Sequence, residues 1–102
     1  MKATRIYISG AIAHHDLSER RKAFTRAEKY IRDVLHAEPV NPFNNGVPSY
    51  EDWRVHMKAD IKLLLECDGI VMLRGWETGK GAKLEFDVAT SCGIQVVKFN
   101  FD

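Results

Sequence analysis

The segment that most constrains the fold of this chain runs from Asp60 to Glu85 and reads DIKLLLECDGIVMLRGWETGKGAKLE. Residues 69–73, GIVML, form a continuous apolar run, which is typical of a strand buried on both faces of a parallel sheet. The glycine-rich segment 75–81 predicts a turn, and the pattern at 82–92 predicts a helix after it. Such strand-to-helix turns open at the carboxyl edge of a parallel sheet, where open α/β folds bind their ligands.

The remainder of the chain also alternates between strand and helix. Further strands are predicted from β-prone runs at 4–8, 38–41 and 94–99. Further helices are predicted from periodic apolar positions at 17–36 and 50–66. The resulting order, βαβαβαβ with connections of helical length, predicts a parallel sheet with helices on both faces. The 102 residues suffice for one core, so residues 1–102 are expected to form a single domain.

The composition excludes several classes of protein. Hydrophobic residues make up 45% and charged residues 28% of the chain, which fits a globular protein and not a disordered one. A formal charge of +1 gives no basis for expecting a nucleic acid polymer or a membrane surface as a partner. No apolar run approaches the ~18–20 residues that span a bilayer, and MKATRIYIS lacks the pattern of a signal peptide. Cys67 and Cys92 have no C-x-x-C spacing, so both are expected to be buried, reduced thiols in a cytoplasmic protein.

Glu85 is the first candidate for chemistry, because it lies near the start of the helix that follows the glycine-rich segment. The apolar side chains of this helix that are expected to face the sheet are Leu84, Val88 and Ala89. Their spacing puts Glu85 along the edge of the apolar stripe. In one interpretation Glu85 is a helix N-terminal glutamate that the helix dipole favours. In the other it is a nucleophile or base held at the crevice by Gly79 and Gly81, where glycine lets the backbone approach a ligand closely.

Asp60 and Tyr7 are candidates to act together with Glu85. Asp60 adjoins the apolar face of helix 50–66. It is either a solvated carboxylate or half of a carboxylate pair for glycosidic chemistry, with one member as nucleophile and the other as acid. Tyr7 is either a core residue or a donor whose hydroxyl positions Glu85. The small-residue turn from Ser9 to Ala11 offers backbone N–H groups for an anion or a sugar hydroxyl.

The polar side chains of His14, His15 and Asp16 suggest a loop and not a metal site. Adjacent histidines point in different directions, and no second ligand lies four residues further on. No metal and no other cofactor is therefore expected. Aromatic side chains in or beside loops either stack on a nucleobase or close the rim of a small core. These aromatic residues are Phe43, Tyr50, Trp53 and Trp76.

The chain resembles the nucleoside 2-deoxyribosyltransferase-like superfamily, in particular its small members, which include nucleotide N-glycosidases. The resemblance covers most of the chain. The matching motifs are IYISGAI at 6–12, VNPF at 40–43, Asp60-Ile61 leading into LLLECDGIVML, and GWETGKGAKLEFDVATSCGI at 75–94. The resemblance implies a flavodoxin-like three-layer α/β/α sandwich with a four- to five-stranded parallel sheet. It also implies cleavage of the N-glycosidic bond of a nucleoside or nucleoside 5′-monophosphate, by hydrolysis or by transfer.

The resemblance also implies roles for individual residues. Glu85 would attack the anomeric carbon as the nucleophile, Asp60 would assist at the base or sugar, and Tyr7 would orient Glu85. The residues expected to contact the substrate are Ser9, Gly10, Ile12, Trp76, Thr78, Gly79, Lys80 and Gly81. Small relatives often have a serine at the position of Gly79 that helps to hold a 5′-phosphate. In this chain that contact would fall to Thr78 or Lys80, and without it an unphosphorylated nucleoside is the expected substrate.

Family members usually form dimers or larger oligomers, so a homodimer or higher homo-oligomer is expected. Two other classes of function stay open at this point. One is a nucleotide-binding or sensing module with the same fold and no turnover. The other is a structural or partner-binding protein without a small ligand.

Overall fold

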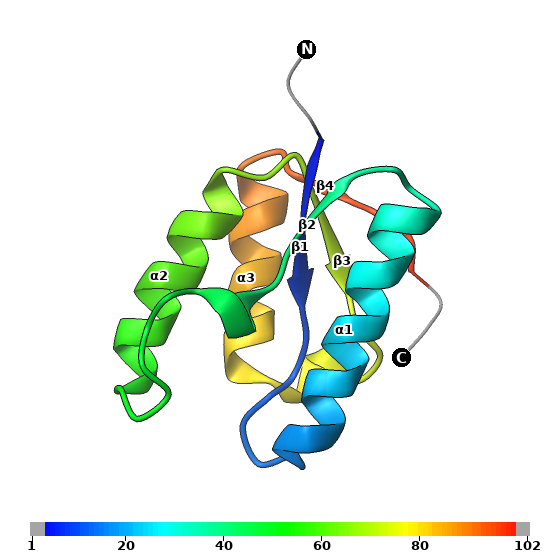
Figure 1. Cartoon of the computed structure of the whole chain (residues 1–102). Helices are drawn as coiled ribbons and strands as arrows, with labels where there is room; N and C mark the ends of the chain where they lie inside the picture. Colours follow the sequence, from blue (N-terminus) through cyan, green and yellow to red (C-terminus); the bar gives the residue numbers. More distant parts are fainter. Residues whose placement is uncertain (1–3, 100–102) are drawn as a thin grey trace.

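The computed structural model describes residues 4–99, which form a four-stranded parallel sheet with helices on both faces (Figure 1). The strands are β1 (Arg5–Ser9), β2 (Glu38–Val40), β3 (Gly69–Met72) and β4 (Gln95–Val96). The helices are α1 (Leu17–Asp33), α2 (Trp53–Leu65) and α3 (Lys80–Ser91), with short 3₁₀ helices η1 (Pro42–Asn44) and η2 (Trp76–Thr78). The strand order is β2-β1-β3-β4, which is the flavodoxin-like order, so the predicted fold class is confirmed.

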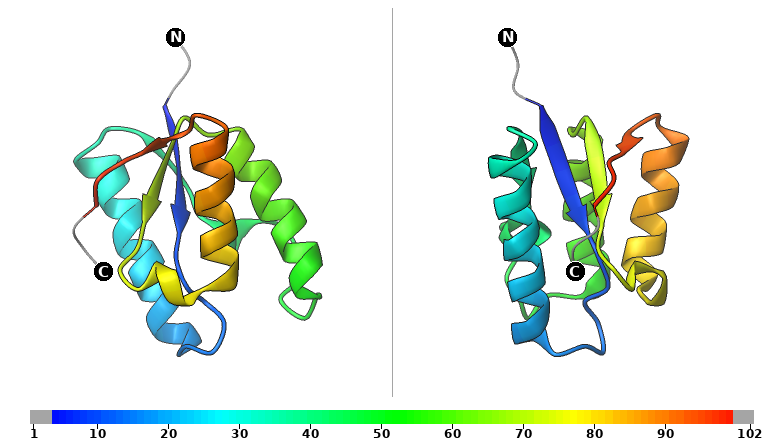
Figure 2. Two further views of the ribbon diagram at one scale, coloured as in Figure 1. Left: turned by 180° about the vertical axis from the view of Figure 1, so that it is seen from behind. Right: turned by 90° about the vertical axis from the view of Figure 1, so that its right-hand side faces the viewer.

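The side chains of β1 alternate between the two faces of the sheet. Ile6 and Ile8 pack into a core that includes residues of α1, whereas Tyr7 packs with Leu64 of α2 and Ala89 of α3. Figure 2 shows α1 and α3 on opposite sides of the sheet. Among residues 4–99, no helix has both the length and the apolar character needed to cross a membrane.

Several boundaries differ from the prediction for local reasons. Helix α1 ends at Asp33 and not at 36, because His36 adopts a left-handed backbone conformation with φ 53°. Val34, which follows the last residue of the helix, is 57% exposed. Helix α2 begins at Trp53 and not at 50, because the preceding residues form a turn in which the Glu51 N–H donates to the Pro48 carbonyl over 3.0 Å. At the carboxyl end of the described chain, β4 covers two residues of the predicted run 94–99.

The buried face of α3 also differs from the prediction. The helix begins at Lys80, and its buried residues are Ala82, Glu85 and Ala89. Leu84 is 41% exposed, so it does not face the sheet as expected. Glu85 therefore lies in the centre of the buried face between two alanines, and not along its edge. Cys92 was also assigned wrongly: it is exposed because it follows the last turn of α3, whereas Cys67 is buried as expected.

Candidate active site

The carboxyl group of Glu85 lies against the end of β1, where two hydroxyl groups hold it. The Tyr7 hydroxyl donates to Oε2 over 2.6 Å, and the Ser9 hydroxyl donates to Oε1 over 2.6 Å. Tyr7 and Ser9 are two residues apart on β1, so both side chains project from the same face of the sheet toward α3. The expected hydrogen bond from Tyr7 is present. Ser9 was expected to contact the substrate directly, and here it is a second donor to Glu85.

Burial sets the protonation behaviour of this group. Only 4% of Glu85 is exposed, and the loss of solvent raises the pKa of its carboxyl from 4.5 to about 7. The hydrogen bonds from Ser9 and Tyr7 act in the opposite direction, and the charge of Asp60 adds to the rise. Burial, and next the charge of Glu85, raise the pKa of the Tyr7 hydroxyl well above its ordinary value of 10. The phenol therefore keeps its proton and remains a donor, while Glu85 changes its charge near neutral pH.

Asp60 is the second buried carboxyl group and comes from α2. It is 8% exposed, so it is not the solvated helix carboxylate of one sequence interpretation. The amide group of Asn45 donates from Nδ2 to Asp60 Oδ1 over 2.8 Å. Burial raises the pKa of Asp60, and the Asn45 hydrogen bond and the nearby His56 ring oppose that rise. The two acids therefore come from neighbouring helices and differ in their hydrogen-bond partners.

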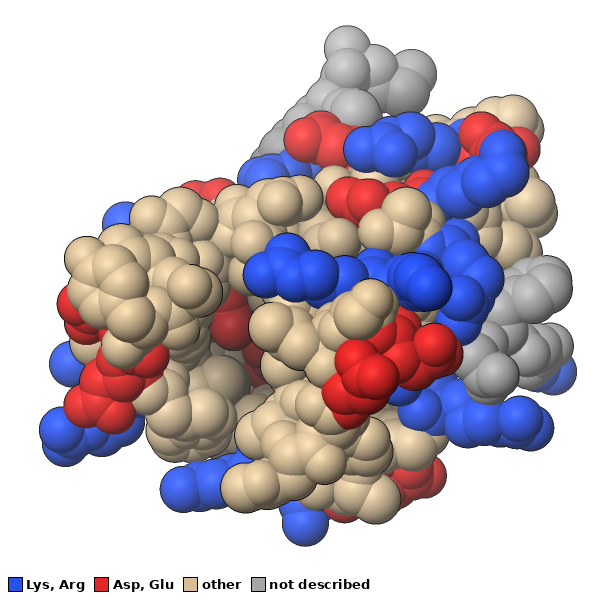
Figure 3. All heavy atoms as spheres, turned by 60° about the horizontal axis from the view of Figure 1, so that its bottom comes forward, with Lys and Arg blue, Asp and Glu red and all other residues tan. Residues whose placement is uncertain are grey.

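Both acids line one cavity at the edge of the sheet where β1 ends. The cavity has a volume of about 400 Å³. Figure 3 views this edge and shows a hollow with acidic atoms deep inside it. Of the residues expected at the site, those that line the cavity are Gly10, Ile12, Asp60, Gly79, Lys80, Gly81 and Glu85. Tyr7 and Ser9 lie behind Glu85 and hold it from the side of the sheet.

The two glycines at the start of α3 allow close packing around the cavity. A Cβ atom on Gly79 would lie 2.9 Å from the Cα of Ala11, so a side chain there would push the loop after β1 away from α3. A Cβ atom on Gly81 would lie 3.0 Å from the Met57 sulfur on α2. Glycine is thus required at residue 79 by the approach of two backbone segments.

Besides Ser9, two of the expected contact residues do not line the cavity, namely Trp76 and Thr78. The indole of Trp76 stacks on Phe86 of α3 with ring centroids 4.8 Å apart. The Thr78 hydroxyl donates to the Gly75 carbonyl over 2.8 Å and lies 3.4 Å from His15 Nε2. Trp76 therefore packs on α3 and the Thr78 hydroxyl closes the η2 turn, whereas Lys80 lines the cavity.

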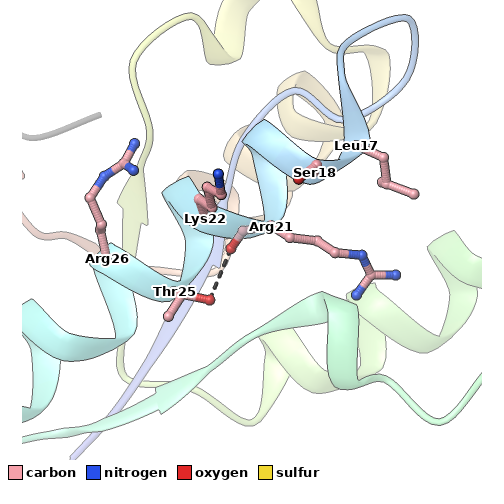
Figure 4. Close-up of a pocket in the computed structure, with 6 residues that line it drawn as sticks. All are labelled: Leu17, Ser18, Arg21, Lys22, Thr25 and Arg26. Atoms are coloured by element: carbon pink, nitrogen blue, oxygen red, sulfur yellow. Dashed lines mark hydrogen bonds between the residues drawn. The ribbon is translucent and has the colours of Figure 1, made fainter.

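Two cations of the cavity lining are held over aromatic rings. The Lys80 ammonium lies 4.4 Å from the ring centroid of Trp53, and the Arg21 guanidinium lies 4.6 Å from that of Phe43. No pattern in the sequence predicts the contact between Arg21 and Phe43. The outer surface of α1 carries a shallow, open depression, and Figure 4 shows Arg21 extending away from Lys22 and Arg26 there.

Asn45 and His56 also line the cavity, and sequence analysis did not assign them to the site. Asn45 lies in a loop whose turn-forming composition gave no sign of a site, and its Nδ2 lies 3.2 Å from His56 Nδ1. The spacing of His56 and Asp60, four residues apart on one helix, is a signal that was available. Within the described residues 4–99, no three His, Cys, Asp or Glu side chains are grouped to hold a metal ion.

Comparison with known proteins gives a family and a set of structural neighbours. The family described as "Domain of unknown function (DUF4406)" matches residues 4–98. No curated protein sequence matches the chain. A conserved protein from Enterococcus faecalis V583 has a similar structure with a TM-score of 0.68 at 21% identity, over 93% of this chain and 62% of the other.

A second similar structure is that of a 2-desoxiribosyltransferase from Leishmania mexicana. The TM-score is 0.64 at 24% identity, over 97% of this chain and 65% of the other. This chain thus spans less than two thirds of either neighbour's length. At these identities the similarity establishes a shared fold.

Proposed function

The chain belongs to the DUF4406 family, and we propose that it cleaves the N-glycosidic bond of a nucleoside or nucleoside 5′-monophosphate. The observation that carries this proposal is the Glu85 carboxyl group, which is buried at a cavity and held by two hydroxyl donors at 2.6 Å. A glutamate that only stabilised a helix N-terminus would need neither the cavity nor the two donors. The fold shared with the Leishmania mexicana 2-desoxiribosyltransferase supports the same class of reaction.

In the proposed reaction, ionised Glu85 attacks the anomeric carbon of the sugar. The C–N bond breaks through an oxocarbenium-like state, and its electron pair leaves with the base, which takes up a proton. The sugar is then joined to Glu85 through an ester. Attack by water releases the sugar, whereas attack by a second base gives transfer, and in both cases Glu85 is restored as a carboxylate. Each carboxylate oxygen accepts a hydrogen bond from one hydroxyl group and keeps a further lone pair with which it can attack the sugar carbon.

The other residues of the cavity would bind the substrate. Asp60 would contact the base, since it lines the same cavity and its charge acts on Glu85. Lys80 and Arg21 would bind the 5′-phosphate of a nucleotide. Neither makes an ion pair with another residue of the described chain, and an aromatic ring holds each cation without occupying its N–H donors.

The test is to incubate the protein with a panel of nucleosides and their 5′-monophosphates and to measure free base by chromatography. We expect release by the wild type, loss of release in Glu85→Gln, and normal release in Glu77→Gln, which makes the same change at an exposed position. Tight binding without release would refute catalysis and support a sensing module. The absence of any thermal shift with the panel would support a partner-binding protein.

We also propose that the protein acts as a homodimer or higher homo-oligomer. The side chains of Tyr50, Trp53 and Val55 at the start of α2 are 84%, 40% and 40% exposed, and Trp53 lines the cavity. Large apolar side chains at a cavity mouth favour coverage by a second chain. Sedimentation at micromolar concentration tests this, and a stable monomer would contradict it.

A further inference from the structure

We propose that Asn45, His56 and Asp60 form a subsite for a base that carries an exocyclic amino group beside a ring nitrogen acceptor, as adenine and cytosine do. All three residues line the cavity, and they are joined by hydrogen bonds. The inference rests on the proposed function, which it deepens by naming the class of base.

The orientation of the Asn45 amide group follows from its contacts. The backbone N–H of Val47 donates to Asn45 Oδ1 over 2.9 Å, which identifies the oxygen end of the amide. The nitrogen Nδ2 therefore faces the other way, where it lies 2.8 Å from Asp60 Oδ1 and 3.2 Å from His56 Nδ1. An amide nitrogen has two N–H donors and no acceptor. Asn45 is thus a positioning residue that donates to both of its neighbours.

These contacts determine what His56 presents to a ligand. Because Asn45 Nδ2 only donates, His56 Nδ1 must accept, and in the neutral ring the proton then lies on Nε2. Nε2 is the nitrogen left free for a ligand, and it is a donor. Asp60 keeps the acceptor capacity of its second oxygen, since the Asn45 hydrogen bond uses Oδ1. His56 and Asp60 are four residues apart on α2, so the donor and the acceptor lie on one face of the helix.

A donor beside an acceptor fits the edge of an amino-bearing base. Adenine offers the N7 acceptor beside the 6-amino donor, and cytosine offers N3 beside its 4-amino donor. The ring nitrogen would accept from His56, and the amino group would donate to Asp60. In hypoxanthine, uracil and thymine a carbonyl oxygen replaces that amino group, and in the same orientation it would face the Asp60 carboxylate without a proton between them. A buried polar group left unpaired in this way discriminates strongly between substrates.

The experiment compares nucleosides whose bases carry either the amino group or a carbonyl oxygen at the same position. Base release is measured for 2′-deoxyadenosine against 2′-deoxyinosine and for 2′-deoxycytidine against 2′-deoxyuridine, each also as the 5′-monophosphate. We expect the amino member of at least one pair to have a kcat/KM about tenfold higher or more. Equal values in both pairs, or a preference for the carbonyl member, would overturn the inference and leave the proposed function intact.

Two variants test whether the network causes the preference. Asn45→Ala removes the hydrogen bonds that fix the His56 tautomer and the position of the Asp60 side chain. The ratio of kcat/KM between the amino and the carbonyl substrate should therefore fall toward one. Asn44→Ala makes the same change at the adjacent, exposed residue and should keep the wild-type ratio. If Asn45→Ala does not fold, His56→Phe removes the Nε2 donor at a partly exposed position and should lower the same ratio. A full preference in the folded variant would contradict the assignment.

The failure of the proposed function gives a different pattern. If the wild type releases no base from any substrate, the glycosidase proposal fails, and the subsite is tested by equilibrium binding of the same nucleoside pairs. We then expect the amino member to bind about tenfold more tightly. Equal affinities, or no binding of any nucleoside, would overturn the inference as well.

Discussion

Replacing Glu85 by glutamine should make the free energy of unfolding less sensitive to pH. The carboxyl of Glu85 has a pKa of about 7 in the folded protein because it is buried, and an ordinary value of 4.5 when solvated. The folded state therefore holds the proton more tightly than the unfolded chain does. The resulting stabilisation is fully present below pH 4.5 and is lost as the pH rises toward and above 7.

The size of this loss follows from the two pKa values. Their difference corresponds to about 3 kcal/mol, because each pKa unit represents about 1.4 kcal/mol. Glutamine has a similar shape and does not ionise, so Glu85→Gln lacks this loss. The new amide group must also change its hydrogen bonds with Tyr7 and Ser9, which adds an offset that does not vary with pH. The effect of the buried charge is therefore measured by how the difference in free energy of unfolding between the two proteins changes with pH. The size of that difference at a single pH does not measure it.

Urea unfolding of both proteins at several pH values between 4 and 8 measures the effect. As the pH rises from 4 to 8, we expect the free energy of unfolding of Glu85→Gln to increase by about 3 kcal/mol relative to that of the wild type. This change is large for a domain stable by about 5–15 kcal/mol. Glu77→Gln is the control for the loss of a carboxylate at the surface. A difference between wild type and Glu85→Gln that stays constant with pH would refute the account, because it would mean that the folded protein solvates this carboxylate as well as water does.

Three further predictions concern the proposed reaction. The rate of base release should rise through about pH 7 as Glu85 ionises. Tyr7→Phe should move the midpoint of that rise to higher pH, because the carboxylate loses one hydrogen bond. A pH–rate profile of each protein measures both effects. Gly79→Ala should destabilise the protein by about 1–3 kcal/mol in urea unfolding, because the new methyl group would clash with the Ala11 backbone. Arg21→Gln should raise KM about tenfold for a 5′-monophosphate and leave KM for the free nucleoside unchanged, in steady-state kinetics.

Matched substitutions serve as controls. Tyr30→Phe removes a phenol on α1, on the opposite side of the sheet from Glu85, and should leave the pH midpoint in place (Figure 2). Lys22→Gln removes a charge one residue from Arg21, on the outer surface of α1, and should leave KM for the monophosphate unchanged (Figure 4). A Gly79→Ala protein as stable as the wild type, or equal effects of the Arg21 and Lys22 changes, would contradict the respective predictions.

The order of strands and helices was predictable because it depends on local patterns. The run at 69–73 lacks polar residues and is buried almost throughout, and the strand ends at Met72, one residue before the predicted end. Helix ends were less predictable. The left-handed conformation of His36 and the turn before Trp53 depend on backbone hydrogen bonds that residue types do not specify.

The centre of the candidate site and part of the cavity lining were predicted from the sequence, whereas Asn45, His56 and Arg21 were not. A hydrogen bond from Tyr7 to Glu85 was one of two interpretations of the residues and was implied by the family resemblance, and the structure contains it. The role of Asn45 depends on how a loop of ordinary turn composition folds over α2. Arg21 and Phe43 lie on two elements that no repeating pattern in the sequence relates, so their contact was not predictable.

The alternation of side chains along β1 bears on how this gene tolerates deletions. Positions 6 and 8 supply one core, while positions 7 and 9 supply the two hydroxyl groups behind Glu85. Removing one codon from this strand would therefore exchange the two sets, burying hydroxyls among the α1 side chains and turning isoleucine toward a carboxylate. Frame-preserving deletions in β1 should be far more damaging than conservative replacements at any single position of the strand.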